Sequence, residues 1–196
     1  HPTARKRTIY EAKALARVRA KSKNANVIGI YDYFEHEGTV VLVLELVEDG
    51  DLADRLEAGT LDWETSIRWM VQILQGLEAI HRANLVHRDL KPGNVLMDGE
   101  RPLITDLGVV HDAQGRNMTQ TGAVLGTPSY MSPEQIRGQK IDARSDLYAA
   151  GILLFELLVG APPFDGASEF DIQKAQTETE VPLERLPSVI PQAVRS

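Results

Sequence analysis

Eight consecutive residues, His87 to Asn94, restrict the possible folds of this chain more than any other segment. They read His-Arg-Asp-Leu-Lys-Pro-Gly-Asn, and the chain continues with Asp-Leu-Gly at 106–108 and Ser-Pro-Glu at 132–134. Asp89 can accept a hydroxyl proton, and Asn94 and Asp106 can supply the hard oxygen ligands that Mg²⁺ prefers. Lys91 places a cation where charge builds up on a phosphoryl group during transfer. The pattern indicates a magnesium-dependent phosphoryl-transfer site, so the fold has to bring these side chains together.

The composition is that of an ordinary globular protein with one core, and it excludes several other classes. The 196 residues are 43% hydrophobic and 25% charged. A net charge of −7 provides no electrostatic attraction to nucleic acid or to anionic lipid. The absence of cysteine excludes disulfides, thiolate zinc sites and a cysteine nucleophile.

No targeting or membrane segment is expected within this sequence. Residues 1–23 are basic and polar, and they lack the apolar centre of a signal peptide. The most apolar stretch, Leu147 to Val159, is shorter than the roughly 20 residues of a membrane span and contains Glu156. We interpret it as a buried helix. We expect a cytoplasmic protein, although a membrane anchor could lie outside this segment.

The start of the chain predicts one helix and one β-hairpin. The helix is expected around Ile9–Arg19, where apolar residues recur at helical spacing, and it carries Glu11. Val27–Phe34 and Thr39–Val47 are rich in β-branched and aromatic residues and are separated by a short polar segment with a glycine. This alternation is typical of a hairpin.

Two capped helices are expected next. Asp51 can cap a short helix over Leu52–Ala58, and Asp62 opens a long one. The apolar positions of the long helix follow helical spacing, at Ile67, Met70, Val71, Leu74, Leu77 and His81.

The second half of the chain predicts short strands, a long loop and further helices. Leu85–Thr105 is interrupted by proline and glycine and is expected to form short strands and loops. Asp106–Tyr130 lacks periodicity, and loops of that length in compact domains are usually functional. Helices are expected at Pro133–Arg137, Asp146–Val159 and Ser168–Thr177, followed by an irregular tail over the last twenty residues.

The three motifs and their order resemble the protein kinase superfamily. The Gly-Thr-Pro-Ser-Tyr-Met-Ser-Pro-Glu-Gln run at 126–135 resembles the bacterial, eukaryotic-like serine/threonine kinases in particular. The resemblance implies an α+β fold: one partial kinase domain over 1–196, with 1–47 a truncated small β lobe and 48–196 a mainly helical large lobe that lacks the final helices. The glycine-rich loop and the strand with the ATP-orienting lysine have no counterpart, so we expect negligible activity from the isolated chain.

The resemblance assigns roles in phosphoryl transfer. Asp89 would be the catalytic base that orients and deprotonates the substrate hydroxyl, and Asn94 and Asp106 would hold Mg²⁺. Lys91, two positions after the base, is typical of serine/threonine kinases. Thr127 would supply the hydroxyl that bonds both Asp89 and Lys91.

The resemblance also implies a nucleotide site at the end of the second strand. Its residues would be Leu44, Glu45, Val47, Asp51, Leu96 and Glu11. Leu44 would be the gatekeeper-like side chain, and backbone groups of Glu45 and Val47 would bond the adenine edge of ATP. Leu96 would pack under the adenine ring, and Asp51 could meet the ribose.

Other implied features concern regulation. Glu11 resembles the helix glutamate that pairs with the ATP-orienting lysine, and Leu107 stands where the family usually has a phenylalanine that sets the active/inactive balance. Arg88 marks kinases whose activation loop is ordered by phosphorylation, because a phosphothreonine carries about −1.5 to −2 charges that arginine can bind. We expect Thr119, Thr121 or both to be autophosphorylated. The alternative for either threonine is an ordinary loop residue whose hydroxyl is not modified.

Several other residues are interpreted as structural. Asp146 resembles the family's buried helix aspartate that holds the catalytic-loop backbone. Glu134 is expected to pair with an arginine beyond the end of the chain and to be partly unsatisfied here. Four side chains that could suggest a cofactor or a metal are better explained by packing or loop hydrogen bonds, because no ligand spacing accompanies them: Trp69, Met70, His81 and His87.

We therefore expect a serine/threonine kinase that transfers the γ-phosphoryl group of ATP, with Mg²⁺, to hydroxyls of protein substrates. One alternative is a pseudokinase-like scaffold or binding module, against which the intact Asp89, Asn94 and Asp106 argue. Another is a small-molecule phosphotransferase, which should lack the Ser-Pro-Glu segment and the long loop. A homodimer of the full-length protein is left open.

Overall fold

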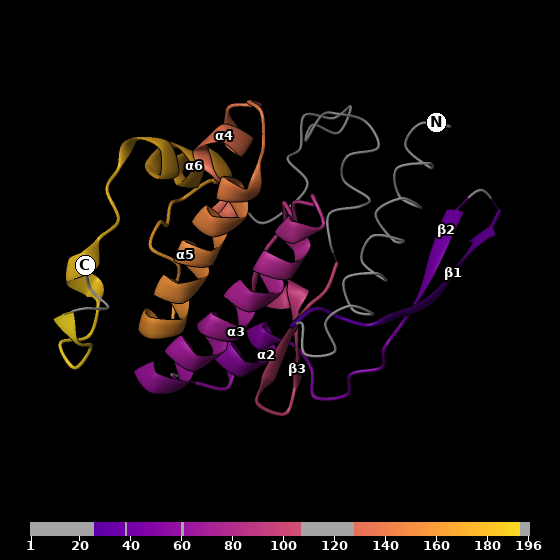
Figure 1. Cartoon of the computed structure of the whole chain (residues 1–196). Coiled ribbons are helices and arrows are strands. Elements are labelled where there is room, and N and C mark those ends of the chain that lie inside the picture. The colour runs from indigo at the N-terminus through magenta and orange to yellow at the C-terminus, as the bar shows by residue number, and fades with distance from the viewer. Residues whose placement is uncertain (1–25, 38, 60, 107–127, 193–196) are drawn as a thin grey trace.

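The computed structural model describes residues 26–37, 39–59, 61–106 and 128–192. The helix expected around Ile9–Arg19 and the residues Leu107 and Gly108 lie outside this part of the chain. The described part is α+β, with a small antiparallel hairpin on one side of a larger helical body (Figure 1). The expectation of an α+β fold is confirmed.

The hairpin of the small lobe consists of β1 (Ile30–His36) and β2 (Thr39–Leu44), which pair antiparallel. The predicted first strand began too early, because Val27 belongs to the larger body. Val27 is fully buried and forms an isolated parallel bridge with Ile104. The backbone N–H of Ile28 donates to the carbonyl of Ile104 at 2.9 Å. A run of β-branched residues indicates extended backbone, but only tertiary context selects the strand with which it pairs.

Two helices follow, α2 (Leu52–Glu57) and α3 (Trp63–Arg82). Each begins at the aspartate that the sequence predicts. The Asp51 carboxylate accepts the backbone N–H of Asp54 at 3.0 Å, and the Asp62 carboxylate accepts that of Thr65 at 2.7 Å. These bonds satisfy backbone donors that have no partner within the first turn of a helix.

The buried face of α3 is rotated relative to the prediction. The buried positions are Ser66, Trp69, Met70, Ile73, Gly76, Leu77 and Ile80. Val71 and Leu74, which were expected in the core, are 48% and 39% exposed. Two small residues mark the true contact face: Ser66 donates to the carbonyl of Leu157 at 3.1 Å, and Gly76 lies against the backbone of Asn26. An apolar pattern misses such a face, because serine and glycine do not count as apolar.

The expected short strands form a second hairpin. A 3₁₀ turn, η1 (Pro92–Asn94), leads into β3 (Val95–Asp98), which pairs antiparallel with β4 (Arg101–Ile104). The backbone N–H of Met97 donates to the carbonyl of Gly50 at 2.9 Å, so this hairpin is tied to the segment that precedes α2.

The apolar stretch near residue 150 forms α5 (Ala143–Val159), a largely buried helix as predicted. It begins three residues before the predicted start, because the Asp142 carboxylate caps it by accepting the N–H of Arg144 at 2.9 Å. Among the helices of the described part, none has both the length and the apolar character that crossing a membrane requires.

Smaller elements surround α5. These are η2 (Pro128–Tyr130), α4 (Pro133–Ile136), α6 (Glu169–Glu178) and η3 (Leu183–Arg185). The positions of α4 and α6 agree with the predicted helices to within a residue or two. α6 contacts both α4 and η2, and η2 also contacts α5.

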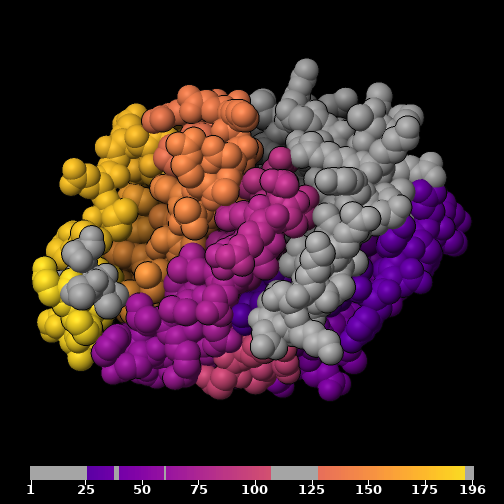
Figure 2. Space-filling model, viewed as in Figure 1, coloured from indigo at the N-terminus to yellow at the C-terminus, as the bar shows by residue number. Residues whose placement is uncertain are grey.

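The main core lies where α3 packs against α5 and β4. Ile73, Leu77, Ile104, Leu153 and Leu157 are each at most 1% exposed. Burial of one such side chain stabilises the fold by roughly 1.5–3 kcal/mol. Figure 2 shows the surfaces of α3 and α5 side by side, with the first hairpin at the far edge of the same face.

The tail expected to be irregular has no α-helix among residues 179–191, but it is packed. Leu186 and Ile190 form a second small core with Phe155 of α5. The Arg185 guanidinium lies 5.3 Å from the centroid of the Phe155 ring and donates to the carbonyl of Pro163 at 3.0 Å. These contacts attach the tail to the end of α5.

Candidate active site

The loop from His87 to Asn94 is anchored from below by Asp146 of α5. The Asp146 carboxylate accepts the backbone N–H groups of His87 and Arg88, both at 2.8 Å. Oδ2 of Asp146, which accepts the N–H of His87, also lies 2.7 Å from the ring nitrogen Nε2 of His81. Asp146 is 1% exposed, so these contacts replace water around a buried carboxylate. The predicted structural role of Asp146 is confirmed.

His87 is fully buried and connects the loop to the end of β4. Its Nε2 lies 2.9 Å from the carbonyl of Thr105, and its Nδ1 accepts the N–H of Asp89 at 3.3 Å. Burial lowers the pKa of His87, although the Asp146 carboxylate pulls the pKa the other way. A neutral ring with its proton on Nε2 satisfies both hydrogen bonds. The interpretation of His87 as a loop-bonding residue is confirmed.

The backbone turns sharply at Arg88, which has a φ of 72°. That left-handed conformation is unfavourable for a residue with a side chain, by roughly 1–2 kcal/mol. The carbonyl of Arg88 accepts Nε2 of Gln135 at 2.7 Å, and Gln135 also forms a capping box with Ser132 at the start of α4. Sequence reasoning missed Gln135, although the Ser-x-x-Gln spacing of that capping box is a recognisable signal.

Two side chains converge on one oxygen of Asp89. Oδ2 of Asp89 accepts Nζ of Lys91 at 3.0 Å and Nδ2 of Asn94 at 2.9 Å. Nδ2 of Asn94 also donates to the backbone carbonyl of Asp89 at 2.7 Å. The side chains of Asp89 and Lys91 are 26% and 25% exposed. Lys91 and Asn94 therefore hold the Asp89 carboxylate through its Oδ2, while the side chain stays accessible to solvent. Within the described part of the chain, no residue bonds to its Oδ1.

Asn94 and Asp106 lie at the same end of the second hairpin. The carbonyl of Asn94 accepts the N–H of Thr105 at 2.9 Å, and Asp106 is the next residue. Asp106 is exposed and has a left-handed φ of 50°. Three of the predicted site residues thus come from one loop, and the fourth, Asp106, lies two residues after the end of β4.

The oxygen donors of Asn94 and Asp106 are of the kind that Mg²⁺ prefers. Within residues 26–106 and 128–192, apart from 38 and 60, no group of three or more His, Asp or Glu side chains could hold a metal ion. Mg²⁺ usually keeps one or two protein oxygens and takes the rest from water and substrate phosphates. Asn94 donates Nδ2 to Asp89, which leaves Oδ1 as its remaining acceptor beside the Asp106 segment.

The predicted nucleotide residues lie around the segment that joins β2 to α2. Asp51 and Leu96 face each other in an isolated antiparallel bridge. The backbone N–H of Glu45 donates to the carbonyl of Gly29 at 2.8 Å, and its carboxylate accepts the N–H of Gly29 at 3.1 Å. Leu44 is the last residue of β2, and Val47 is partly buried. The structure brings Asp51 and Leu96 together and attaches Glu45 to the small lobe.

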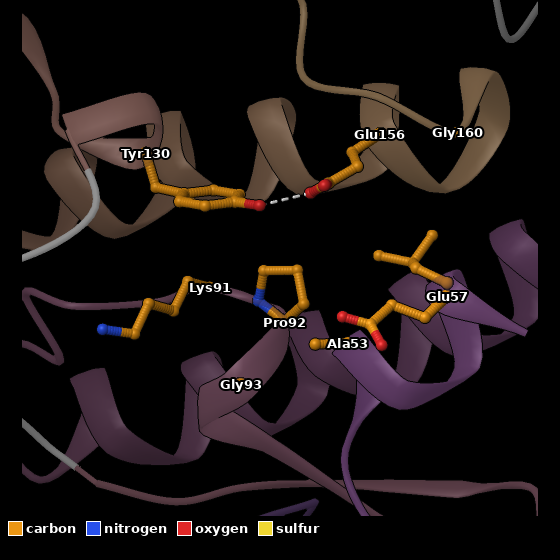
Figure 3. Close-up of a pocket in the computed structure, with 9 residues that line it drawn as sticks. Ala53, Glu57, Lys91, Pro92, Gly93, Tyr130, Glu156 and Gly160 are labelled. Carbon is orange, nitrogen blue, oxygen red and sulfur yellow. Dashed lines mark hydrogen bonds between the residues drawn. The ribbon is translucent and has the colours of Figure 1, made fainter. Parts of the chain in front are cut away.

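A pocket of 480 Å³ opens beside the loop from His87 to Asn94. One wall is formed by Lys91, Pro92 and Gly93, and Glu57 of α2 forms another. Glu156 of α5 closes the pocket on the side opposite Pro92 (Figure 3). Sequence reasoning treated Glu156 only as a charge in an apolar stretch, because nothing local indicates that the last turn of α5 faces this loop.

Tyr130 lines the same pocket and bonds to Glu156. Its hydroxyl donates to Oε2 of Glu156 at 2.5 Å (Figure 3). Burial, and next the hydrogen bond to Glu156, raises the pKa of Tyr130, so the phenol keeps its proton. Burial also raises the pKa of Glu156, while the hydrogen bond from Tyr130 lowers it. The pair holds the segment before α4 against α5.

Glu134 is bonded within this chain, which corrects the expectation that it is partly unsatisfied. Its Oε1 accepts the hydroxyl of Ser145, at the start of α5. Burial alone would raise the pKa of Glu134, but the hydrogen bonds from Ser145 and from the backbone hold that pKa below its usual value. Sequence reasoning missed Ser145 as the partner of Glu134, because it considered only a positively charged partner for this carboxylate.

Several residues of the predicted site lie outside the described part of the chain. They are Glu11, Leu107, Thr119, Thr121 and Thr127. Their roles stay predictions.

Comparison with known proteins agrees with this geometry. Residues 2–193 match the family described as "Protein kinase domain". The chain is 40% identical over 175 residues to the serine/threonine-protein kinase PknL of Mycobacterium tuberculosis, a match that covers 88% of this chain and 43% of PknL. It is 37% identical over 174 residues to the serine/threonine-protein kinase PrkC of Bacillus subtilis, with 87% and 27% covered. The chain spans less than half the length of these relatives.

Proposed function

Because this chain belongs to the protein kinase family, we propose that it carries the catalytic loop of a serine/threonine kinase, which transfers the γ-phosphoryl group of ATP to protein hydroxyls. Kinases of this family use ATP and Mg²⁺ in general. One observation carries the proposal: Lys91 and Asn94 hold the same oxygen of Asp89 at 3.0 and 2.9 Å. A carboxylate held in this way presents its other oxygen to a substrate in a defined direction.

Asp89 acts as the catalytic base in this proposal. Its Oδ1 accepts the hydroxyl proton while the substrate oxygen forms a bond to the γ-phosphorus and the bond from that phosphorus to ADP breaks. Lys91 bonds to Oδ2 and places its positive charge beside the oxygens on which negative charge develops. A positioned base of this kind contributes about 10²- to 10⁴-fold to the rate.

Asn94 and Asp106 are the proposed magnesium ligands, through Oδ1 and the carboxylate. Both flank the same end of the β3–β4 hairpin, where the N–H of Thr105 donates to the carbonyl of Asn94 at 2.9 Å, and this supports the assignment. When bound, Mg²⁺ would neutralise charge on the phosphate oxygens. Asn94 has a second role, because its amide keeps the backbone and side chain of Asp89 in place.

We assign adenine and ribose recognition to the segment between β2 and α2. The residues are Leu44, Glu45, Val47, Asp51 and Leu96, together with Glu11 of the first predicted helix. The N–H of Glu45 is used by Gly29, so the carbonyl of Glu45 and the N–H of Val47 are the groups assigned to the adenine edge. The bridge between Asp51 and Leu96 supports a common binding surface for ribose and base.

The domain division and compartment are part of the same proposal. Residues 1–47 belong to the small lobe and residues 48–196 to the large lobe. Because ATP is plentiful in the cytoplasm, we place the catalytic site on the cytoplasmic side of the cell membrane.

A phosphotransfer assay with the full-length protein tests this function. We expect transfer of radiolabelled phosphate from ATP to serine and threonine peptides, dependent on added Mg²⁺. Asp89→Asn should lower kcat by roughly 10²- to 10⁴-fold with little change in thermal unfolding. The exposed Asp98→Asn is the matched control and should retain wild-type kcat. A wild-type protein that transfers no phosphate, or an Asp89→Asn variant with full kcat, would refute the proposal.

Serine/threonine specificity and regulation involve residues of the loop before α4. We propose that Thr127 bonds Asp89 and Lys91, and that phosphate on Thr119 or Thr121 is bound by Arg88. Mass spectrometry of active protein should find at least one of these two threonines phosphorylated. Detection of neither in active enzyme would contradict this regulation and leave the catalytic role of Asp89 unaffected.

A further inference from the structure

The peptide group between Arg88 and Asp89 is held at both of its ends. Its carbonyl accepts Nε2 of Gln135 at 2.7 Å, and its N–H donates to Nδ1 of His87 at 3.3 Å. A peptide group is planar and rotates as one unit, so two bonds at opposite ends fix the direction in which the chain enters Asp89. The bond from Gln135 ties this peptide plane to α4, 47 positions away in the sequence.

This peptide plane follows a residue in an unfavourable conformation. Arg88 has a φ of 72°, and a residue with a side chain stays in the left-handed region only where its surroundings hold it there. Before Arg88, its own N–H donates to Oδ1 of Asp146 at 2.8 Å. After Arg88, the shorter of the two bonds comes from Gln135. Without that bond, the plane can rotate toward a less strained conformation and move Asp89 with it.

Both ends of the Gln135 amide are used, and only one of them is needed for the helix cap. Oε1 accepts the N–H of Ser132 at 3.0 Å in the capping box, and Nε2 donates to the carbonyl of Arg88. Gln135 is 8% exposed, so both bonds are buried. A capping box is formed by glutamate as well as by glutamine at this position. The cap therefore does not explain the amide, whereas the carbonyl of Arg88 does, because an ionised carboxylate cannot donate to it.

We propose that Gln135 is a positioning residue for Asp89, which acts by fixing the peptide plane that precedes the proposed base. This inference rests on the proposed function, since it adds a residue that orients the group assigned to proton transfer. Loss of the Gln135 bond should lower kcat and leave the KM for ATP unchanged, because the residues assigned to adenine and ribose lie between β2 and α2.

Two variants of the full-length protein separate the Arg88 bond from the cap. Gln135→Glu keeps an acceptor for the N–H of Ser132 and removes the donor to Arg88, and Gln135→Met has a similar length and removes both. At pH 8 each should lower kcat by roughly 10- to 100-fold, with the KM for ATP within about twofold of wild type. Asp62→Ala is the control. It removes a capping bond of 2.7 Å at the opposite end of α3 from the loop and should keep wild-type kcat.

The pH dependence of Gln135→Glu distinguishes positioning from a general loss of stability. A protonated carboxyl can donate to the carbonyl of Arg88 as the amide does, and an ionised one cannot. Because burial favours the protonated form, kcat of this variant relative to wild type should rise by at least about threefold from pH 8 to pH 6. The same ratio for Gln135→Met should stay constant. The ionisable groups of the loop, α4 and α5 near Gln135 are the same in all three proteins, so the ratio removes their contribution: His87, Arg88, Asp89, Glu134, Arg137 and Asp146.

Hydrogen–deuterium exchange reports on the same peptide plane without phosphate transfer. The N–H of Asp89 is protected by its bond to His87, and that bond depends on the orientation of the plane. Mass spectrometry of the proteolytic peptide that contains this N–H should show roughly tenfold faster exchange in both Gln135 variants. Asp62→Ala should exchange there at the wild-type rate.

Three results would each overturn the inference: full kcat in Gln135→Glu, a kcat ratio of that variant that does not change with pH, or unchanged exchange at Asp89 in both variants. If Gln135→Glu does not fold, kcat and exchange of Gln135→Met decide. Failure of the proposed function is a separate result. In a wild-type protein that transfers no phosphate, faster exchange in the variants would retain the restraint by Gln135, and unchanged exchange would refute it.

Discussion

Among single residues, His87 couples the shape of the loop from His87 to Asn94 to the protonation state of its own ring. Its neutral ring accepts from Asp89 at Nδ1 and contacts the carbonyl of Thr105 at Nε2. A second proton on the ring would remove the acceptor that the Asp89 N–H uses. Burial lowers the pKa of His87 below its ordinary value of 6.5, which favours the neutral ring in the folded protein. The loop geometry therefore depends on this ring staying neutral.

Stability should fall with pH below about 6.5 because of this residue. The unfolded chain binds a proton at His87 near pH 6.5 while the folded protein does not, so the free energy of unfolding is greatest above that pH. It should decrease by up to about 1.4 kcal/mol per pH unit as pH falls from 6.5 toward the lowered pKa. Urea unfolding between pH 7.5 and 5.5 measures this slope. His87→Asn should flatten the slope, and an equal slope in that variant would assign the effect to another group.

Among elements, the contact between α3 and the strand segment near Asn26 depends on a glycine. A Cβ atom on Gly76 would lie 2.4 Å from the carbonyl oxygen of Asn26 and 2.9 Å from Cδ1 of Ile104. Backbone atoms cannot move away as a flexible side chain can. Gly151 is the opposite case within α5, because a Cβ there meets nothing within 4 Å. The two glycines occupy the same kind of secondary structure and differ only in packing.

Alanine at these two positions should have opposite effects. Gly76→Ala gains about 1 kcal/mol of helix propensity but forces apart packed backbone, so the free energy of unfolding should fall by roughly 1–3 kcal/mol. Gly151→Ala should raise it by roughly 0.5–1 kcal/mol. Urea unfolding of both variants gives the comparison. A stabilised Gly76→Ala protein would show that α3 and the Asn26 segment are not in close contact.

At the scale of the whole molecule, the proposed active site lies where separate elements meet. The loop from His87 to Asn94 follows α3, the proposed magnesium ligands lie at one end of the second hairpin, and Asp146 of α5 holds the loop from below. Gln135 of α4 bonds the same loop at Arg88. The core between α3 and α5 is therefore also the support of the site. Loss of that packing should disturb the positions of Asp89 and its partners together.

Much of this arrangement could be predicted from local chemistry. Asp51 and Asp62 were identified as helix caps because an aspartate before an apolar periodic run has a specific local partner. Asp89, Lys91 and Asn94 lie within six residues of each other, so their spacing already implied a shared site. The buried face of α3 was not predicted correctly, since its contacts with Leu157 and Asn26 depend on residues far away in the chain.

The amino-acid sequence alone determined most of the elements, the caps of α2 and α3 and the chemical character of the loop from His87 to Asn94, because these depend on neighbours within one or two turns. Tertiary structure decided that Asp146 holds the loop, that Ser145 bonds Glu134, and that α2 and α5 end at one pocket. Hydrogen bonds and electrostatic fields act over a few ångströms of space, and residues separated by tens of positions become neighbours only when the chain folds.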